Sequence, residues 1–296
     1  LQTIGSQADV VSALVFSADG QALHVGRMDG STEKIALRLA KGTDSLAKAD
    51  AEAKSIETSK AEPIELAEKE PNNIPAEATA ITLPAVLTGM IHGEQGIDSD
   101  LFLFQAKAGE EWVLETNAAR SKSPIDTKLE VLDADGNPIE RARLKAVRES
   151  WLTFRGKDSN TSNDFRLFKW DEMTLNQLLY VNGEVVKLWL YPRGPDSGYI
   201  VYPGSGNRHG YFDTTPLAHP LGQPAYIVEP LAKGEPEIAN GLPTFPVHYQ
   251  NDDESQRRLG RDSKLTFTAP ADGQYLARVS DVRGFSGSDF KYTLTV

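Results

Sequence analysis

The chain has 296 residues, 40 % of them hydrophobic, which is enough to bury a sizeable core. Its net charge of −11 argues against a nucleic-acid surface, because phosphate binding needs clustered lysines and arginines. The lack of cysteine excludes disulfides, thiolate metal sites and cysteine nucleophiles, and no apolar run approaches the roughly 18 residues of a membrane span. Because the chain begins at Leu1 inside a strand-like pattern, we expect it to be a piece of a longer protein with an upstream targeting signal.

The N-terminal segment predicts a β-hairpin followed by a linker. Residues 10–28 alternate apolar and polar side chains on both sides of the turn sequence Ser-Ala-Asp-Gly at 17–20. Residues 1–39 also resemble the end of a WD-type propeller repeat without its Trp-Asp signature, and an ordinary hairpin is the alternative. Residues 40–63 are rich in Ala, Lys, Glu and Ser and predict a linker with some helical character.

From residue 64 to 296 the sequence predicts an all-β fold. Short alternating segments are separated by Gly, Pro, Asn and Asp at the even spacing typical of a β-sandwich or jelly roll. The expected strands are Ala85–Met90, Leu101–Ala106, Glu111–Thr116 and Lys128–Leu132, and near the C-terminus 275–279 and 290–296.

Residues 141–250 break this rhythm and predict an inserted, mixed but mostly β subdomain. The block contains three of the four tryptophans. We expect one helix over Asp171–Tyr180 with Asp171 as its N-cap, and a hairpin formed by Glu184–Tyr191 and Gly198–Tyr202. The proline-rich residues 216–246 predict an extended loop packed on the sheet.

Two oxygen-rich stretches suggest a cation site. The segment 68–73, Glu-Lys-Glu-Pro-Asn-Asn, and the pair around Ser99 at the head of a strong strand together offer enough oxygens for calcium, which takes about six to eight. The alternative is a capped turn beside a solvated strand entrance. The candidate ligands are Glu68, Glu70, Asn72, Asn73, Asp98 and Asp100.

Several motifs together resemble the bacterial pre-peptidase C-terminal domain over residues 66–140 and 249–296. They are Glu-x-Glu-Pro-Asn-Asn at 68–73, Asp-x-Asp-x-Phe-x-Phe at 98–104, Leu-Asp-x-Asp-Gly at 132–136, Asn-Asp-Asp at 251–253 and Ala-Pro-Ala-Asp-Gly-x-Tyr at 269–275. Such domains are β-sandwiches appended to secreted enzymes, lack catalytic residues and are similar to the collagen-binding domains of bacterial collagenases. In those relatives calcium sits where the linker crosses the sandwich, which implies the same six ligands here.

The aromatic residues of the insertion are candidates for a ligand platform. A sugar ring or a peptide could pack on their faces, and the alternative is that Trp189 and Tyr199 form the insertion's own core. The candidate residues are Trp170, Trp189, Tyr191, Arg193, Tyr199 and Tyr202.

The sequence therefore predicts a non-catalytic accessory module of a secreted or surface multidomain bacterial protein, with an extracellular, periplasmic or cell-surface location. Its partners would be other domains of the same polypeptide and a glycan or protein ligand. An enzyme is disfavoured, because the five histidines show no His-Glu-x-x-His spacing and no serine lies in a Gly-x-Ser-x-Gly elbow. A pocket lined by Trp189, Tyr191 and His209 would favour catalysis instead.

Overall fold

The predicted all-β class is confirmed. The computed structural model describes residues 11–16, 22–27, 31–36, 62–93, 98–153, 162–194, 197–204, 208–232, 234–237 and 239–296. The chain divides into two compact units, Leu1–Glu62 and Pro63–Val296. The only helical elements of the described residues are four 3-10 turns, η1 (Pro75–Glu77), η2 (Ala119–Ser121), η3 (Trp170–Glu172) and η4 (Tyr211–Asp213).

The first unit contains a three-stranded antiparallel sheet. Its strands are β1 (Val11–Phe16), β2 (Ala22–Arg27) and β3 (Thr32–Ala36), paired in chain order. The expected pairing of the first two strands is present, and a third strand extends it. The turn at 17–20 and residues 40–61 of the expected linker lie outside the described residues.

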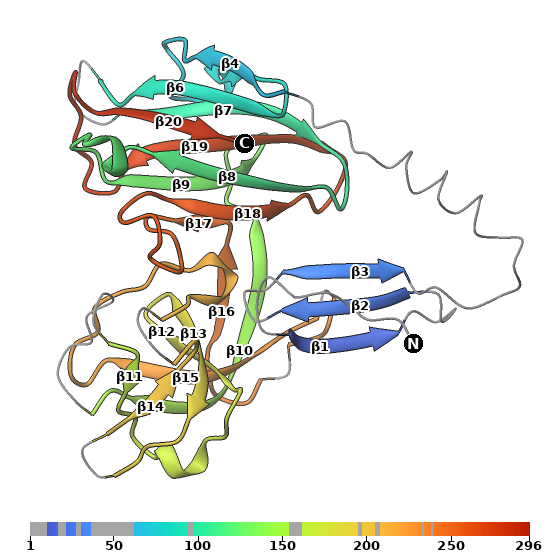
Figure 1. Ribbon diagram of the computed structural model, residues 1–296, viewed down its shortest axis with the longest axis vertical. Helices are drawn as coiled ribbons and strands as arrows, with labels where there is room; N and C mark the ends of the chain where they lie inside the picture. Colours follow the sequence, from blue (N-terminus) through green and yellow to red (C-terminus); the bar gives the residue numbers. More distant parts are fainter. Residues whose placement is uncertain are drawn as a thin grey trace, which may run out of the picture. The chain divides into compact units, whose positions relative to one another are not determined.

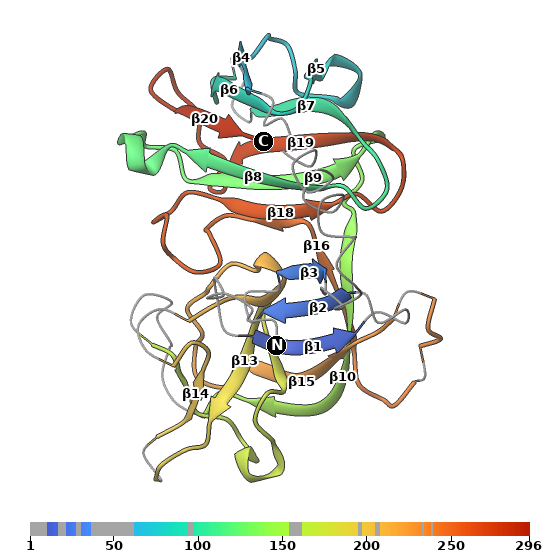
Figure 2. The ribbon, with the colours of Figure 1, turned by 45° about the vertical axis from the view of Figure 1, so that its right-hand side comes forward.

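Most of the second unit is a sandwich of two five-stranded sheets (Figures 1 and 2). The orders are β17-β9-β19-β7-β5 and β18-β8-β20-β6-β4. The strands are β4 (Ile64–Ala67), β5 (Thr79–Ala80), β6 (Ala85–Met90), β7 (Ser99–Ala106), β8 (Glu111–Asn117), β9 (Thr127–Asp133), β17 (Gln250–Asn251), β18 (Lys264–Thr268), β19 (Gly273–Asp281) and β20 (Lys291–Thr295).

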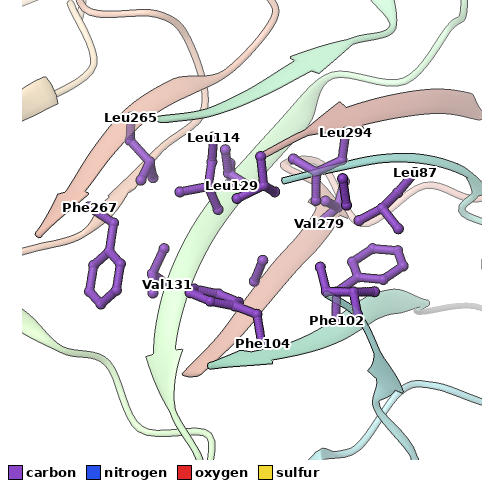
Figure 3. Packing of buried hydrophobic residues seen from close by; sticks show 14 of the residues in the cluster. Leu87, Phe102, Phe104, Leu114, Leu129, Val131, Leu265, Phe267, Val279 and Leu294 are labelled. Atoms are coloured by element: carbon purple, nitrogen blue, oxygen red, sulfur yellow. The ribbon is translucent and has the colours of Figure 1, made fainter. Parts of the chain in front are cut away.

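The core of the sandwich lies between these sheets (Figure 3). Alternation along β7 buries Phe102 and Phe104 on the inner face, as a half-buried strand requires. The ring of Phe104 meets that of Phe267 edge to face at 6.1 Å, which joins strands of opposite sheets.

The insertion forms a seven-stranded sheet of order β11-β14-β13-β12-β15-β10-β16 (Figure 1). Apolar clusters cover both of its faces, so this sheet has its own core. The strands are β10 (Glu140–Trp151), β11 (Asp164–Phe165), β12 (Leu178–Val181), β13 (Glu184–Leu190), β14 (Tyr199–Val201), β15 (Pro224–Pro230) and β16 (Thr244–His248).

The helix expected over Asp171–Tyr180 is wrong. The chain instead makes the short turn η3 and then strand β12, which pairs with β13 and β15. Asn176 has a φ of 69°, a left-handed conformation that interrupts a helix. Leu179 and Val181 alternate into the core, so burial on a sheet outweighs local helix propensity.

The extended loop expected over residues 216–246 is also wrong in part. Strand β15 lies inside the sheet between β10 and β12, and β16 forms its edge. Pro224 and Pro230 occupy the ends of β15, while Pro246 lies in the edge strand. Proline lacks an N–H, and all three places tolerate that loss. The expected hairpin of Glu184–Tyr191 with Gly198–Tyr202 is present as β13 and β14.

The turn η4 joins the insertion to the sandwich. The carboxylate of Asp213 accepts a hydrogen bond of 2.8 Å from the backbone N–H of Thr266 on β18. The side-chain amide of Asn251 donates to the Asp213 carbonyl at 3.1 Å. The N–H of Gly210 also donates to the Ser255 carbonyl at 2.9 Å, so the contact extends beyond one residue.

Candidate metal centre

The segment 68–78 crosses from one sheet of the sandwich to the other. It leaves edge strand β4 and enters edge strand β5, which belong to opposite sheets. Backbone hydrogen bonds fix both ends, from the Glu68 N–H to the Thr88 carbonyl at 2.9 Å and from the Leu101 N–H to the Asn72 carbonyl at 3.1 Å. The first stretch of candidate ligands is thereby brought against the second.

Three of the predicted ligands converge. Carboxylate oxygens of Glu68, Glu70 and Asp100 all lie within 4.8 Å of one another. Asp100 is completely buried, and so is Asn72, whereas Asp98 is 4 % exposed. Glu68 is half-buried and Glu70 is exposed. A buried acid such as Asp100 beside other carboxylates is costly unless a proton or a cation neutralises it.

Each buried carboxylate is held through one oxygen. Glu68 Oε1 accepts from the Met90 N–H at 2.8 Å, and Asp98 Oδ2 accepts from the His92 N–H at 2.5 Å. The hydroxyl of Tyr292 donates to Asp100 Oδ2. The side chains are therefore positioned before any ligand binds.

The remaining polar atoms of these side chains are buried without a hydrogen-bond partner among the residues that the structure describes. They are Glu68 Oε2, Asp98 Oδ1, Asp100 Oδ1, and both Oδ1 and Nδ2 of Asn72. An unsatisfied buried polar group costs about 1–3 kcal/mol. The oxygens among them form a donor set that suits a hard cation.

The raised pKa values of the cluster also favour binding of a cation. Burial raises the pKa of Asp100 to about 10, and the charge of the neighbouring Glu68 adds to the rise. Burial also raises the pKa of Glu68, and burial with the charge of Asp98 raises that of Glu70. With this pKa, Asp100 keeps its proton at neutral pH, and a divalent cation would replace that proton.

Asp98 does not belong to the converging group of three carboxylates. Asn73 also lies apart, and two supporting residues were not predicted. Asn73 is exposed, and its Oδ1 accepts from the Ser99 N–H at 3.1 Å. Tyr292 and Gly89 support the site from β20 and β6, where they form a cross-strand pair. Their separation in sequence from Asp100 left no local signal by which to find them.

The residues of the predicted aromatic platform differ in burial and do not form one surface. Tyr199 is completely buried and donates from its hydroxyl to the Met173 carbonyl at 3.0 Å, so it belongs to the core. Trp189 pairs with Tyr202, with ring centroids 5.6 Å apart. Trp170 and Tyr191 are 45 % and 46 % exposed. Arg193 is exposed beside Trp170 in a pocket of the insertion.

Two pockets lie in the second unit. One of about 310 Å³ lies where the insertion meets the sandwich, between residues such as Tyr180 and Asp252. The other, of about 660 Å³, lies in the insertion beyond β11 and contains Trp170. Neither is lined by Trp189, Tyr191 or His209, the combination that would favour catalysis.

A buried ionic network stabilises the insertion. Arg208 donates to both carboxylate oxygens of Glu184, at 2.5 and 2.9 Å, and His219 Nε2 lies 2.6 Å from Glu184 Oε2. All three side chains are at most 1 % exposed. Burial would raise the pKa of Glu184, but the hydrogen bonds and charges of His219 and Arg208 outweigh burial and lower it.

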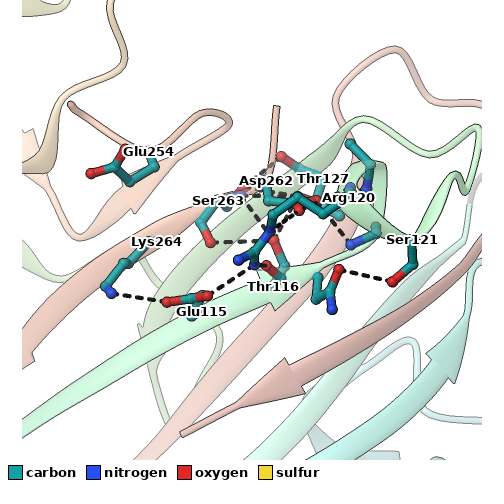
Figure 4. Close-up of polar contacts among 12 residues, drawn as sticks. Glu115, Thr116, Arg120, Ser121, Thr127, Glu254, Asp262, Ser263 and Lys264 are labelled. Carbon is teal, nitrogen blue, oxygen red and sulfur yellow. Dashed lines mark hydrogen bonds and ion pairs between the residues drawn. The ribbon is translucent and has the colours of Figure 1, made fainter. Parts of the chain in front are cut away.

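A second polar network surrounds Asp262 in the sandwich (Figure 4). Asp262 accepts from the N–H groups of Ala118 and Ala119 at 2.9 and 2.7 Å and from Arg120 Nε at 2.6 Å. The hydroxyl of Ser263 donates to the Thr127 carbonyl at 2.6 Å. Ser263, which directly precedes β18, is completely buried, and its hydroxyl links it to β9.

No family model matches the chain, and no curated protein sequence is similar to it. Within the described ranges, none of the helices is long and apolar enough to cross a membrane.

Proposed function

We propose that this protein is a non-catalytic accessory module of a secreted or surface multidomain bacterial protein, in which calcium ties the linker to the sandwich. The observation that carries the proposal is the set of buried, unpartnered oxygens on Glu68, Asn72, Asp98 and Asp100. They come from the crossing segment and from the start of β7, two parts of the chain that a shared cation would join.

Glu68, Glu70, Asp98 and Asp100 would supply the carboxylates, and Asn72 would supply an amide oxygen. Calcium suits such a set because it accepts about six to eight oxygens in irregular geometry, whereas magnesium demands a near-ideal octahedron. The bound ion would supply positive charge in place of the proton on Asp100. The chain's own contribution is to hold the carboxylates in place through Met90, His92 and Tyr292.

The proposed consequence is a fixed position for the segment that joins β4 to β5, and with it for the edge strand through which the chain enters the sandwich. The segment 68–78 presents its ligands only when it lies across the sandwich, so calcium stabilises the docked arrangement by mass action. At a concentration of about 100 times the Kd this stabilisation amounts to about 2.7 kcal/mol.

The test is a thermal melt of the whole chain in EDTA and in millimolar calcium. We expect calcium to raise the Tm of the wild type, and the double substitution Glu70→Gln, Asp100→Asn to abolish this rise. The control is Glu77→Gln, Asp135→Asn, which removes the same charge from two exposed positions. The same rise in both double variants, or none in the wild type, would contradict the proposal.

A second candidate function is glycan or protein binding through the insertion. It is favoured by one observation, the exposure of Trp170 beside Arg193 in the larger pocket. This second binding function would not require the calcium site.

A further inference from the structure

The larger pocket of the insertion combines aromatic faces with positive charge. Its lining comes mainly from residues 166–170, which follow edge strand β11, and from residues 192–194 and 197–198, which precede β14. We call it the Trp170 pocket, and its charged and aromatic lining residues are Arg166, Phe168, Lys169, Trp170 and Arg193.

The charge of this pocket is opposite to that of the chain. The protein carries a net charge of −11, yet every charged side chain that lines the pocket is cationic. Neither Lys169 nor Arg193 forms an ion pair with any residue in the described part of the chain. Glu172, an acid close by in the sequence, pairs with Arg148 instead. The pocket therefore favours an anion.

Ring stacking and backbone hydrogen bonds hold the aromatic residues of the pocket in place. Phe168 stacks on Trp151 with ring centroids 3.7 Å apart and an interplanar angle of 13°. The Phe168 N–H donates to the Trp151 carbonyl at 3.0 Å. Next to it, Trp170 leaves 45 % of its surface exposed, and its carbonyl accepts from the buried Tyr199 hydroxyl at 3.1 Å.

The backbone beside these rings has an unusual conformation. Lys169 has a φ of 53° and a ψ of 38°, the left-handed region that a residue with a long side chain rarely adopts. Its Nζ lies 5.6 Å from the centre of the Phe168 ring, within cation–π range. Such conformations cluster at ligand sites, because the surrounding structure must stabilise them.

We propose that the Trp170 pocket binds an acidic oligosaccharide, a short chain of uronate or sulfated sugar rings. The C–H faces of the rings would pack on Trp170, while their carboxylates or sulfates would pair with Lys169 and Arg193. The volume of about 660 Å³ lies within the range of small-ligand sites, about 300–1,000 Å³. A flat aromatic face next to cations suits a charged sugar better than a flexible acidic peptide, whose ordering costs more entropy.

The test is calorimetric titration of the whole chain with tetragalacturonate and, separately, with a heparin-derived tetrasaccharide. Cellotetraose serves as the neutral sugar and tetraglutamate as the acidic peptide. The titrations are run in EDTA, because acidic sugars bind calcium themselves, at a temperature where circular dichroism shows the folded protein. We expect at least one acidic sugar to bind roughly tenfold or more tightly than both cellotetraose and tetraglutamate. Added salt should weaken the binding of that sugar.

Two variants assign the binding to the pocket. Lys169→Met with Arg193→Gln, and separately Trp170→Ala, should each weaken it roughly tenfold or more. The matched controls are Lys107→Gln and Phe285→Ala, an exposed lysine and an exposed aromatic residue of the sandwich, and both should bind as the wild type does. The inference is overturned if no acidic sugar binds, if cellotetraose or tetraglutamate binds equally well, or if the control variants weaken binding as much as the pocket variants.

Discussion

The hydroxyl of Tyr292 donates to the buried carboxylate of Asp100, so a strand of one sheet holds an acid on a strand of the other. On its own sheet, Tyr292 lies directly across from Gly89. Asp100 in turn faces Glu68 of the crossing segment. The candidate calcium site is therefore assembled from both layers of the sandwich and from the segment that joins them.

Replacement of Tyr292 by phenylalanine should destabilise the protein in EDTA. The substitution keeps the ring but leaves Asp100 Oδ2 without its donor, at a cost of about 1–3 kcal/mol. Urea unfolding monitored by circular dichroism measures the change. Tyr191→Phe is the control, because that ring is 46 % exposed, and it should leave the free energy of unfolding unchanged. Equal losses in both variants would argue against a special role for the Tyr292 hydroxyl.

Gly89→Ala should displace Tyr292 and Glu68 from their positions at the site. A Cβ atom at Gly89 would lie 2.3 Å from the Tyr292 hydroxyl oxygen and 2.7 Å from Glu68 Oε2. We expect a loss of roughly 1–3 kcal/mol in unfolding free energy, and a smaller rise of Tm with calcium than in the wild type. Differential scanning calorimetry with and without calcium measures both quantities.

Gly273→Ala is the matched control for that substitution. The nearest neighbour of its added Cβ would be the Tyr275 hydroxyl at 4.0 Å, an ordinary contact. Its calcium response should equal that of the wild type. A rise of Tm with calcium in Gly89→Ala as large as in the wild type would show that calcium binding does not require the present positions of Tyr292 and Glu68.

The ionic network of the insertion should give the protein an acid-sensitive stability. The folded state lowers the pKa of Glu184 below its ordinary value of 4.5, so the stabilisation is present above pH 4.5 and is lost as the pH falls through the folded value. Glu184→Gln leaves Arg208 and His219 without their carboxylate and should cost about 3–5 kcal/mol at pH 7.

The measurement is urea unfolding between pH 3 and pH 7. The difference between the wild type and Glu184→Gln should shrink as the pH falls below 4.5, because the unfolded wild type takes up a proton on Glu184 before the folded state does. Glu149→Gln, an exposed residue of β10, should track the wild type throughout. A difference that stays constant with pH would mean that the carboxylate charge does not contribute.

The strands of the sandwich could be predicted because their patterns are local. Phe102 and Phe104 alternate with less buried neighbours, and Gly or Asp residues mark the turns that follow. The convergence of Glu68 and Glu70 with Asp100 also followed from two short oxygen-rich stretches, one of them at the head of a strand. Tyr292 could not be found in this way, because 192 residues separate it from Asp100.

The insertion was harder to predict because distant contacts decide its structure. Leu175, Leu178 and Leu179 have spacings that suit a helix as well as a strand, and only pairing with β13 and β15 selects the strand. Tyr199 is completely buried whereas Trp170 is 45 % exposed, and composition alone does not say which aromatic ring is buried.

The insertion leaves and re-enters the sandwich through β10 and β16, which pair antiparallel from Glu140 and His248 onward. In topological terms the whole subdomain occupies the tip of one hairpin, and its two chain ends are neighbours. A sequence that replaced the insertion would have to start and finish at that spacing, and it would lose the contacts that η4 makes with β18 and Asn251. The strand connections of the two-layered core would stay unchanged while the sequence between β10 and β16 varied.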